Sequence, residues 1–316
     1  MKTAPEMEIQ ISILVDPTNP QAIIRDAEQI FRYSYRNADF NHINNAFMLT
    51  KILYDGNLPG YLACGVEYHD FAHVAAVFAA TSRLLDGCEL TGIKLGATLA
   101  GEVLIAALLH DTGYIRKEGD NSGTGAQYTK VHVARSAAFV MLEAETFGLT
   151  PESAERISRL ILGTDLERPW ETISFQSEKE RIAAEILAAA DIMGQMADRV
   201  YLEKLKFLYY EFSEAGIEGF DSTIDMLKKT IGFYDYVKER LHVTLGRVSS
   251  RTKEHFHTRY FVARDLYDEA ITNQMTYLRS IIADDGIDFP KRLRRTQGLG
   301  RDRETGENYL LEASFH

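Results

Sequence analysis

The chain is poor in cysteine and has no long apolar run. Its two cysteines, Cys64 and Cys88, lack the spacing of a metal site, and one pair does not make a disulfide framework. No stretch approaches the roughly 18 consecutive apolar residues that a membrane-spanning helix requires. Residues 1–8 contain no apolar signal core. These absences predict a protein without a membrane span that stays in the cytoplasm.

Positive charge is scarce as well. Asp and Glu number 46 against 35 Lys and Arg, and the formal net charge is -11. Because affinity for a phosphate backbone comes mainly from clustered Lys and Arg, this balance argues against a nucleic-acid partner. Basic residues gather only in the segment 291–303, which we expect to be a solvated chain end.

Helical periodicity is present along most of the chain. Ile23, Ala27 and Ile30 recur at helical spacing, and two-residue alternation, the pattern of a strand, appears only briefly in residues 8–15. The apolar residues are spread over the whole length, so one continuous core is feasible. We therefore predict an all-α fold.

The predicted organisation is a single multi-helix domain with short flanks. Its parts are a helical lead-in over 1–40, the domain itself over 41–284 and an irregular basic tail over 285–316. Turn formers in residues 113–125 predict a loop between two helices. Helix starts are predicted at Thr150-Pro151, a cap followed by a first-turn proline, and at Ser177, which opens a capping box.

Four of the nine histidines, at positions 69, 73, 110 and 132, lie close together in the sequence. His69 and His73 are four apart in the segment 67–73, which we predict to be helical, so that both imidazoles emerge on one face. Such a pair can hold a metal ion or a substrate. It can also be a hydrogen-bonded pair near a helix start, and the spacing alone leaves both interpretations open.

Acidic residues follow two apolar runs. His110 and Asp111 come directly after the run 104–109, and Asp191 comes directly after 186–190. Ionisable groups in such positions are costly unless they are paired or bind a metal. A capping Asp beside a chance His is the simpler alternative for the first pair. Taken together, the H-x3-H pair, the H-D pair and the distant Asp are similar to the signature of the HD hydrolase superfamily.

The similarity extends to one branch of that superfamily, the catalytic domain of class I 3',5'-cyclic-nucleotide phosphodiesterases. Residues 68–77 resemble the motif Y-H-N-x-x-H-A-x-x-V, and residues 161–166 resemble I-L-A-T-D-M. Residues 190–192 resemble A-D-L/I, and residues 231–237 resemble V-G-F-I-D-Y-I. These elements follow the family's order and cover roughly residues 68–241.

This resemblance implies an HD/PDEase-like domain that hydrolyses a cyclic nucleotide or a related small phosphoester through a metal-bound hydroxide. The positions that match the ligands of the first metal are His73, His110, Asp111 and Asp191. His69 matches the histidine that protonates the leaving oxygen. Two divalent ions are implied, and Zn, Mg, Mn or Fe would suit imidazole and carboxylate donors.

The resemblance also assigns a second-metal shell and a substrate pocket. His132 matches a histidine near the water shell of the second metal, although it fits a core position too. The positions that match the pocket are Tyr68, Thr230 and Phe233. Phe233 corresponds to an aromatic clamp over the base, but an aromatic residue at helical spacing also fits the core.

Several positions depart from the family pattern. Thr230 stands where the phosphodiesterases carry the glutamine that hydrogen-bonds the purine. The H-D pair is followed by Thr-Gly-Tyr-Ile in 112–115, without the third histidine of H-D-x-x-H-P-G, and Thr129 replaces a glutamate. Asp70 replaces an asparagine. These differences predict a second metal held weakly or differently, and another mode of substrate recognition.

Three alternatives remain open. The same His and Asp set can hold the mixed-valent iron pair of an HD-type oxygenase. The segment 69–73 imitates the H-E-x-x-H of metalloproteases, with Asp70 in place of the general base. A nucleotide-binding regulatory module without turnover is the non-enzymatic alternative.

The aromatic stretch 201–212, which looks exposed, is compatible with a homodimer.

Overall fold

A computed structural model describes residues 9–283 and residue 293. These residues form twelve α-helices joined by short 3-10 and π turns, with one isolated antiparallel bridge between Tyr61 and Lys117 and no strand. The predicted all-α fold is thereby confirmed. The basic segment 291–303 and the predicted tail 285–316 lie outside the described residues, apart from Leu293.

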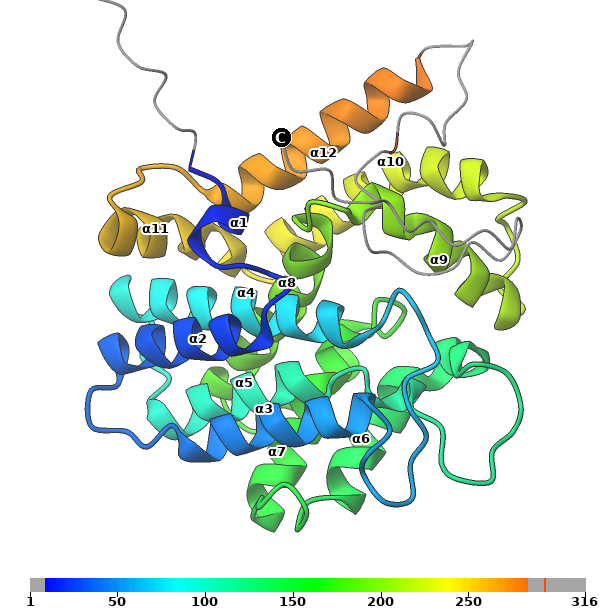
Figure 1. Cartoon of the computed structure of the whole chain (residues 1–316). Coiled ribbons are helices and arrows are strands. Elements are labelled where there is room, and N and C mark those ends of the chain that lie inside the picture. Colours follow the sequence, from blue (N-terminus) through cyan, green and yellow to red (C-terminus); the bar gives the residue numbers. More distant parts are fainter. Residues whose placement is uncertain (1–8, 284–292, 294–316) are drawn as a thin grey trace, which may run out of the picture.

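Figure 1 shows the arrangement of the helices. Their bounds are α1 Ile11–Leu14, α2 Pro20–Ser34, α3 Asn41–Tyr54, α4 Phe71–Leu90, α5 Ala97–Leu109, α6 His132–Leu142, α7 Pro151–Ile161, α8 Glu178–Met196, α9 Tyr201–Glu214, α10 Thr223–Glu239, α11 Thr252–Tyr260 and α12 Leu266–Ile282. The buried helix α4 packs against α2, α5, α8 and α11, and α8 also contacts α5 and α7. The core therefore lies around α4, α5 and α8.

Local signals set two of the helix starts. The Thr150 side chain accepts a hydrogen bond from the N–H of Ser153, and Pro151 occupies the first turn of α7. The Ser177 side chain accepts a hydrogen bond from the N–H of Glu180 at the start of α8. Each cap satisfies a donor that has no partner within the helix, which stabilises the helix by about 1 kcal/mol. Both predicted starts are confirmed.

Helix α4 begins later than predicted. Asp70 has extended backbone (φ -84°, ψ -178°), and its carboxylate accepts a hydrogen bond from the His73 N–H at 2.9 Å. The prediction that His69 and His73 share one helical face is therefore wrong, because a capping Asp70 requires non-helical backbone ahead of the first turn. The two imidazoles are still neighbours, with ring centroids 5.5 Å apart.

Helices α8 and α4 approach closely at Gly194. A Cβ at this position would lie 3.0 Å from backbone atoms of Val77. The missing side chain thus lets the two helices pack backbone to backbone. On α8, Asp191 lies about one turn before Gly194, and on α4 His73 lies about one turn before Val77. This contact brings Asp191 to His73.

The first helices pack onto the rest of the molecule. Asp26 of α2 forms an ion pair with the buried Arg83 of α4 at 3.1 Å, and Arg83 donates a hydrogen bond to the Tyr267 hydroxyl of α12 at 2.9 Å.

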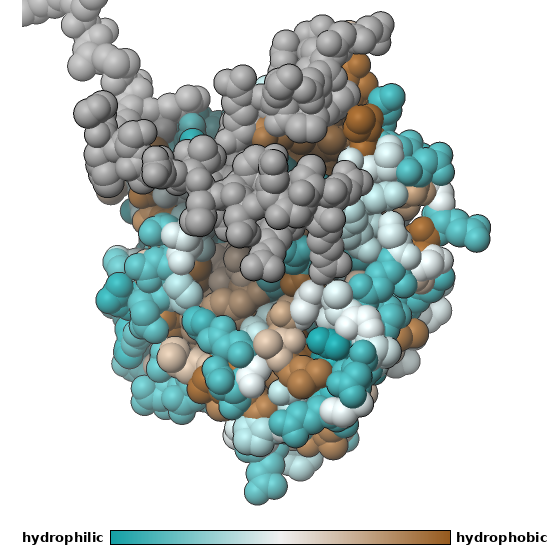
Figure 2. Space-filling view, turned by 45° about the vertical axis from the view of Figure 1, so that its right-hand side comes forward, coloured by the Kyte–Doolittle hydropathy of each residue, from teal (hydrophilic) through white to brown (hydrophobic). Residues whose placement is uncertain are grey.

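Polar and apolar groups are mixed over the face of the molecule that Figure 2 shows. Among the described residues, no helix combines the length and apolar character needed to cross a bilayer. The predicted boundary at residue 40 stays a prediction.

Candidate metal centre

Side chains from α4, α8 and the end of α5 converge on one buried point. The Nε2 atoms of His73 and His110 are 3.2 Å apart. The Oδ2 atom of Asp111 lies 3.1 Å from the first of these nitrogens and 3.3 Å from the second. The Oδ1 atom of Asp191 lies 3.4 and 3.6 Å from them. The donor atoms of His73, His110 and Asp111 thus all lie within 4.8 Å of one another, and Asp191, whose side chain is 18% exposed, adjoins both imidazoles.

The ring of His110 is held in a defined orientation. Its Nδ1 lies 2.9 Å from the carbonyl oxygen of Ala107, one turn earlier in α5. That contact places a proton on Nδ1, so that Nε2, which faces Asp111, is the nitrogen that would give up its proton to bind an ion. Residue 110 is the C-cap of α5, so the helix end itself aims the imidazole at the cluster.

Charge compensation dominates the electrostatics of the cluster. Burial alone would lower the pKa of His73, but the carboxylates of Asp111 and Asp191 raise that pKa to about 9. The same two carboxylates raise the pKa of His110 despite its burial. Burial alone would raise the pKa of Asp111 and of Asp191. The nearby histidines, above all His110, nevertheless hold the pKa of each carboxyl below its usual range. Without an ion, therefore, protons on the imidazoles balance the two carboxylates.

One atom of the cluster is left without a hydrogen bond. Asp111 is 2% exposed, and its Oδ2 has no donor in hydrogen-bond geometry although two imidazole nitrogens lie near it. The protonated imidazoles compensate this buried oxygen only through poorly aligned contacts, and a divalent ion at the same point would compensate it directly. Two imidazoles and two carboxylates form a donor set that suits a borderline or hard divalent ion. The residues present thus fit the predicted metal.

His69 lies beside this cluster and is fixed by a residue that the sequence did not single out. Its Nδ1 is 2.6 Å from Oε2 of Glu211, which is buried in α9. The other carboxylate oxygen, Oε1, accepts a hydrogen bond from the N–H of Tyr68 at 2.7 Å. Glu211 therefore holds both the ring and the backbone of the segment before α4.

His132, at the start of α6, faces the other carboxylate oxygen of Asp111. Its Nε2 is 3.6 Å from Asp111 Oδ1, and its Nδ1 is 2.6 Å from the carbonyl oxygen of Thr129. Burial lowers the pKa of His132 more than Asp111 raises it, so this imidazole is neutral near pH 7. A neutral Nε2 facing a carboxylate oxygen is placed to meet an ion or its water shell.

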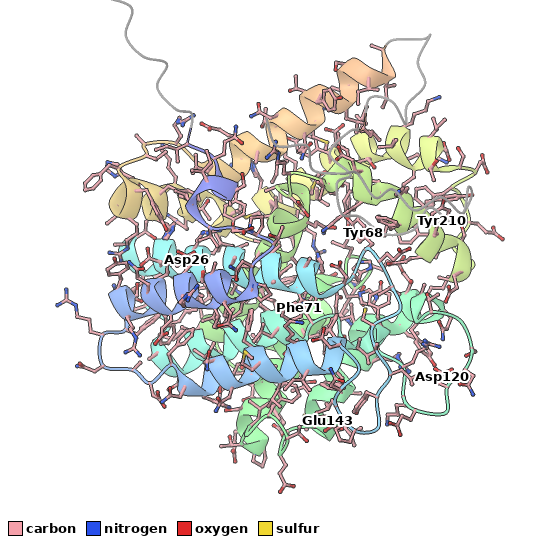
Figure 3. The ribbon with its side chains drawn as sticks, in the orientation of Figure 1. Asp26, Tyr68, Phe71, Asp120, Glu143 and Tyr210 are labelled. Atoms are coloured by element: carbon pink, nitrogen blue, oxygen red, sulfur yellow. The ribbon has the colours of Figure 1, made fainter. Side chains whose placement is uncertain are left out.

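The three residues suggested for the substrate pocket lie in different surroundings. Tyr68, labelled in Figure 3 near α9, is buried, and its hydroxyl donates to Oε1 of Gln195 at 2.8 Å. Thr230 is buried too, and its hydroxyl donates to the carbonyl of Met226 within α10. Phe233 is half-buried and packs on the apolar core. A pocket role for these residues stays a prediction.

The predicted loop in 113–125 connects η1, Thr112–Tyr114, with η2, Ala126–Val131. Thr124 donates to Glu214 of α9 from its N–H at 2.6 Å and from its hydroxyl at 2.9 Å. A Cβ at Gly113 would lie 2.0 Å from the carbonyl oxygen of His132, so only glycine fits there. The loop is thus held between α9 and α6.

Tyr114 is a second residue of this region that the sequence did not single out. It is 1% exposed, and its ring centroid lies 4.5 Å from that of His69 and 4.6 Å from that of His132. Burial and the charges of Asp111 and Glu211 raise the pKa of its phenol, so the hydroxyl keeps its proton.

The aromatic stretch of α9 also differs from expectation, because Tyr209 is half-buried instead of exposed.

Comparison with protein families gives a match to part of the chain. A family described as Npun_R2479-like is similar to this chain over residues 117–254. The matched range contains His132, Asp191 and Glu211, and it begins after the other residues of the cluster. No curated protein and no solved structure matches the chain.

Proposed function

We propose that the protein is a metal-dependent phosphodiester hydrolase of the HD type, similar to the catalytic domain of cyclic-nucleotide phosphodiesterases. The observation that carries this proposal is the convergence of His73, His110 and Asp191 on Asp111, whose buried Oδ2 has no well-aligned hydrogen bond. The substrate class is a cyclic nucleotide or another small phosphoester.

In this scheme the metal ligands bind and shield the ion. A divalent ion bound by the four ligands would polarise a phosphoryl oxygen and lower the pKa of a coordinated water. The protein keeps the ligands apart from bulk solvent, because His73, His110 and Asp111 are almost fully buried. In that environment the charge of a bound ion would act strongly on an anionic substrate.

His69 is the proposed proton donor. Its Nδ1 is paired with Glu211 at 2.6 Å, so that nitrogen keeps a proton and the other, Nε2, exchanges one with the substrate. A protonated Nε2 would pass its proton to the leaving oxygen as the phosphorus–oxygen bond breaks. Glu211 acts through His69 and is a positioning residue in this scheme.

The contacts in the structure argue against one alternative function and are compatible with another. The metalloprotease alternative requires Asp70 as a general base, but its carboxylate is used to cap α4 through the N–H of His73. The di-iron oxygenase alternative uses the same ligand set and is compatible with the geometry. It is separated from the hydrolase by iron content and an optical or EPR signal, and the regulatory module is separated by ligand binding without turnover.

The test is hydrolysis of bis(p-nitrophenyl) phosphate and of 3',5'- and 2',3'-cyclic nucleotides by wild type loaded with Mn²⁺, Mg²⁺, Zn²⁺ or Fe²⁺. Turnover is expected in wild type and is expected to be lost in Asp191→Ala. Turnover that persists in the variant would reveal a contaminating enzyme. Absence of turnover with every ion would overturn the proposed hydrolase.

A further inference from the structure

Tyr114 is placed at the junction of the metal cluster and the proposed proton donor. It ends the short turn η1, three residues after Asp111. Its ring is nearly parallel to that of His69, with 11° between the planes, and the two centroids are 4.5 Å apart. The other neighbour is His132, whose ring centroid lies 4.6 Å from that of Tyr114 and 6.0 Å from that of His69. The side chain therefore contacts two neighbouring histidines of the site.

The hydroxyl of Tyr114 is buried and has no hydrogen-bond partner. Buried tyrosine hydroxyls usually find one, as those of Tyr61 and Tyr68 do with Glu143 and Gln195, although the hydroxyl of Tyr54 also lacks one. The Thr129 hydroxyl lies close enough to lower the pKa of the phenol, and it donates its own proton to the carbonyl of Ala126 at 2.7 Å, but it is not in hydrogen-bond geometry with Tyr114. The Tyr114 hydroxyl thus lacks a well-aligned acceptor.

The neighbours of this hydroxyl indicate what kind of acceptor is missing. The phenol feels the carboxylates of Asp111 and Glu211, but neither accepts its hydrogen bond. Glu211 is used by His69 and Tyr68. An oxygen of a ligand bound at the metal cluster would supply such an acceptor. A phosphoryl oxygen matches it, because it is anionic and accepts hydrogen bonds strongly.

We propose that the Tyr114 hydroxyl donates a hydrogen bond to an oxygen of the phosphoryl group bound at the metal cluster. This inference rests on the proposed function and adds a residue that holds the substrate. In this scheme the ring contact with His69 keeps the hydrogen-bond donor and the proton donor in one fixed relation. Tyr114 then contacts a non-bridging oxygen of the phosphate, and His69 contacts the leaving oxygen of the same phosphate.

Tyr114→Phe tests the assignment, with inorganic phosphate as the probe and calorimetry of the Mn²⁺-loaded full chain as the measurement. A hydrogen bond to a charged acceptor predicts phosphate binding weaker by about 10- to 100-fold. Mn²⁺ affinity is expected to stay within about twofold of wild type, since the phenol is not a ligand in this scheme. Tyr61→Phe is the matched control: it removes a buried hydroxyl bound to Glu143 and should leave phosphate affinity unchanged.

Folding of the variant is checked in the metal-free state. Because the Tyr114 hydroxyl has no partner there, Tyr114→Phe should melt at or above the wild-type temperature, whereas Tyr61→Phe should melt below it. A lower melting temperature for Tyr114→Phe would mean that the hydroxyl has a structural partner, which overturns the proposal.

Two binding results would also overturn it. Unchanged phosphate affinity in Tyr114→Phe would show that the hydroxyl does not touch the phosphoryl group, and a lost Mn²⁺ affinity would place Tyr114 among the metal's own partners. Failure of the hydrolase proposal is seen separately. In that case wild type binds Mn²⁺ and phosphate, and Tyr114→Phe weakens phosphate, but no phosphoester is turned over.

Discussion

The carboxylate of Glu211 holds Nδ1 of His69 at 2.6 Å, although 142 residues separate them in the chain. The pair joins α9 to the segment just before α4, because the same carboxylate binds the backbone N–H of Tyr68. A histidine that transfers protons needs one defined orientation and one defined tautomer, and Glu211 supplies both. The proposed function of His69 therefore depends on the packing of a distant helix.

Glu211→Gln is expected to lower kcat by about 100-fold, at the lower end of what proton transfer by a placed side chain contributes. KM and Mn²⁺ affinity should change little, because Glu211 is not among the four ligands. The loss should be smaller for bis(p-nitrophenyl) phosphate than for a cyclic nucleotide, since p-nitrophenolate leaves without protonation. Equal losses with both substrates would contradict the positioning role. Glu143→Gln, which alters a carboxylate bound to Tyr61, serves as the control.

Asp191→Asn is expected to lower the affinity for Mn²⁺ or Zn²⁺ by more than about 100-fold and to abolish turnover. Loss of a residue that only hydrogen-bonds to a metal ligand costs about 10- to 100-fold in affinity, and loss of a direct ligand should cost more. The measurement is competition against a chelating dye. Asp198→Asn is a matched control, since that carboxylate follows the same helix and pairs with Lys204 at 2.8 Å. Ion affinity that survives in Asp191→Asn would remove Asp191 from the site.

Ion binding should release protons and strengthen with pH. The pKa of His73 is raised to about 9 without an ion, and a bound ion requires the neutral imidazole. Affinity is therefore expected to rise from pH 6 to pH 9 and to level off above it. Calorimetry in buffers of different ionisation enthalpy measures the released protons. An affinity that does not depend on pH would show that His73 is neutral before the ion binds.

The same raised pKa makes the metal-free protein lose stability in alkali. A histidine with a folded-state pKa above its unfolded value of roughly 6.5 stabilises the fold fully below that value. This contribution is lost as the pH rises from 6.5 through about 9, where the folded-state group gives up its proton. Melting temperatures of the metal-free chain should fall over this range, and those of the Mn²⁺-loaded chain should fall less. Parallel pH curves for the two forms would contradict this linkage.

Local signals in the sequence were sufficient for much of the fold. The caps at Thr150 and Ser177 depend on residues within three positions, and both occur as predicted. The start of α4 was misplaced because Asp70 competes with helix formation through its own side chain. Periodicity records where apolar residues recur, but it does not record that competition.

The candidate site was only partly predictable for a different reason. His110 and Asp191 stand out because they interrupt apolar runs, so their burial and need for partners can be inferred locally. Glu211 lies in an ordinary mixed helix, and only the packing of α9 brings it to His69. Tyr114 likewise looks like any core aromatic, and its hydroxyl becomes notable only when all the neighbours are placed.

The contact between α8 and α4 gives a prediction that links packing to the site. In Gly194→Ala the new Cβ would lie 3.0 Å from backbone atoms of Val77, so the two helices must separate. We expect the free energy of unfolding to fall by about 1 to 3 kcal/mol. Mn²⁺ affinity should fall as well, because Asp191 moves away from His73 with the helix. Chemical denaturation and chelator competition measure the two effects.

Gly232→Ala is the matched control for Gly194→Ala. Both glycines lie inside helices, but a Cβ at Gly232 meets no atom within 4 Å. Alanine is favoured over glycine in a helix by up to about 1 kcal/mol, so this variant should be slightly more stable than wild type and bind Mn²⁺ normally. If Gly194→Ala destabilised the chain but left Mn²⁺ affinity at the wild-type value, the position of Asp191 would not depend on this helix contact. Loss of affinity in Gly194→Ala alone would instead establish that the closeness of two backbones sets the geometry of the ligands.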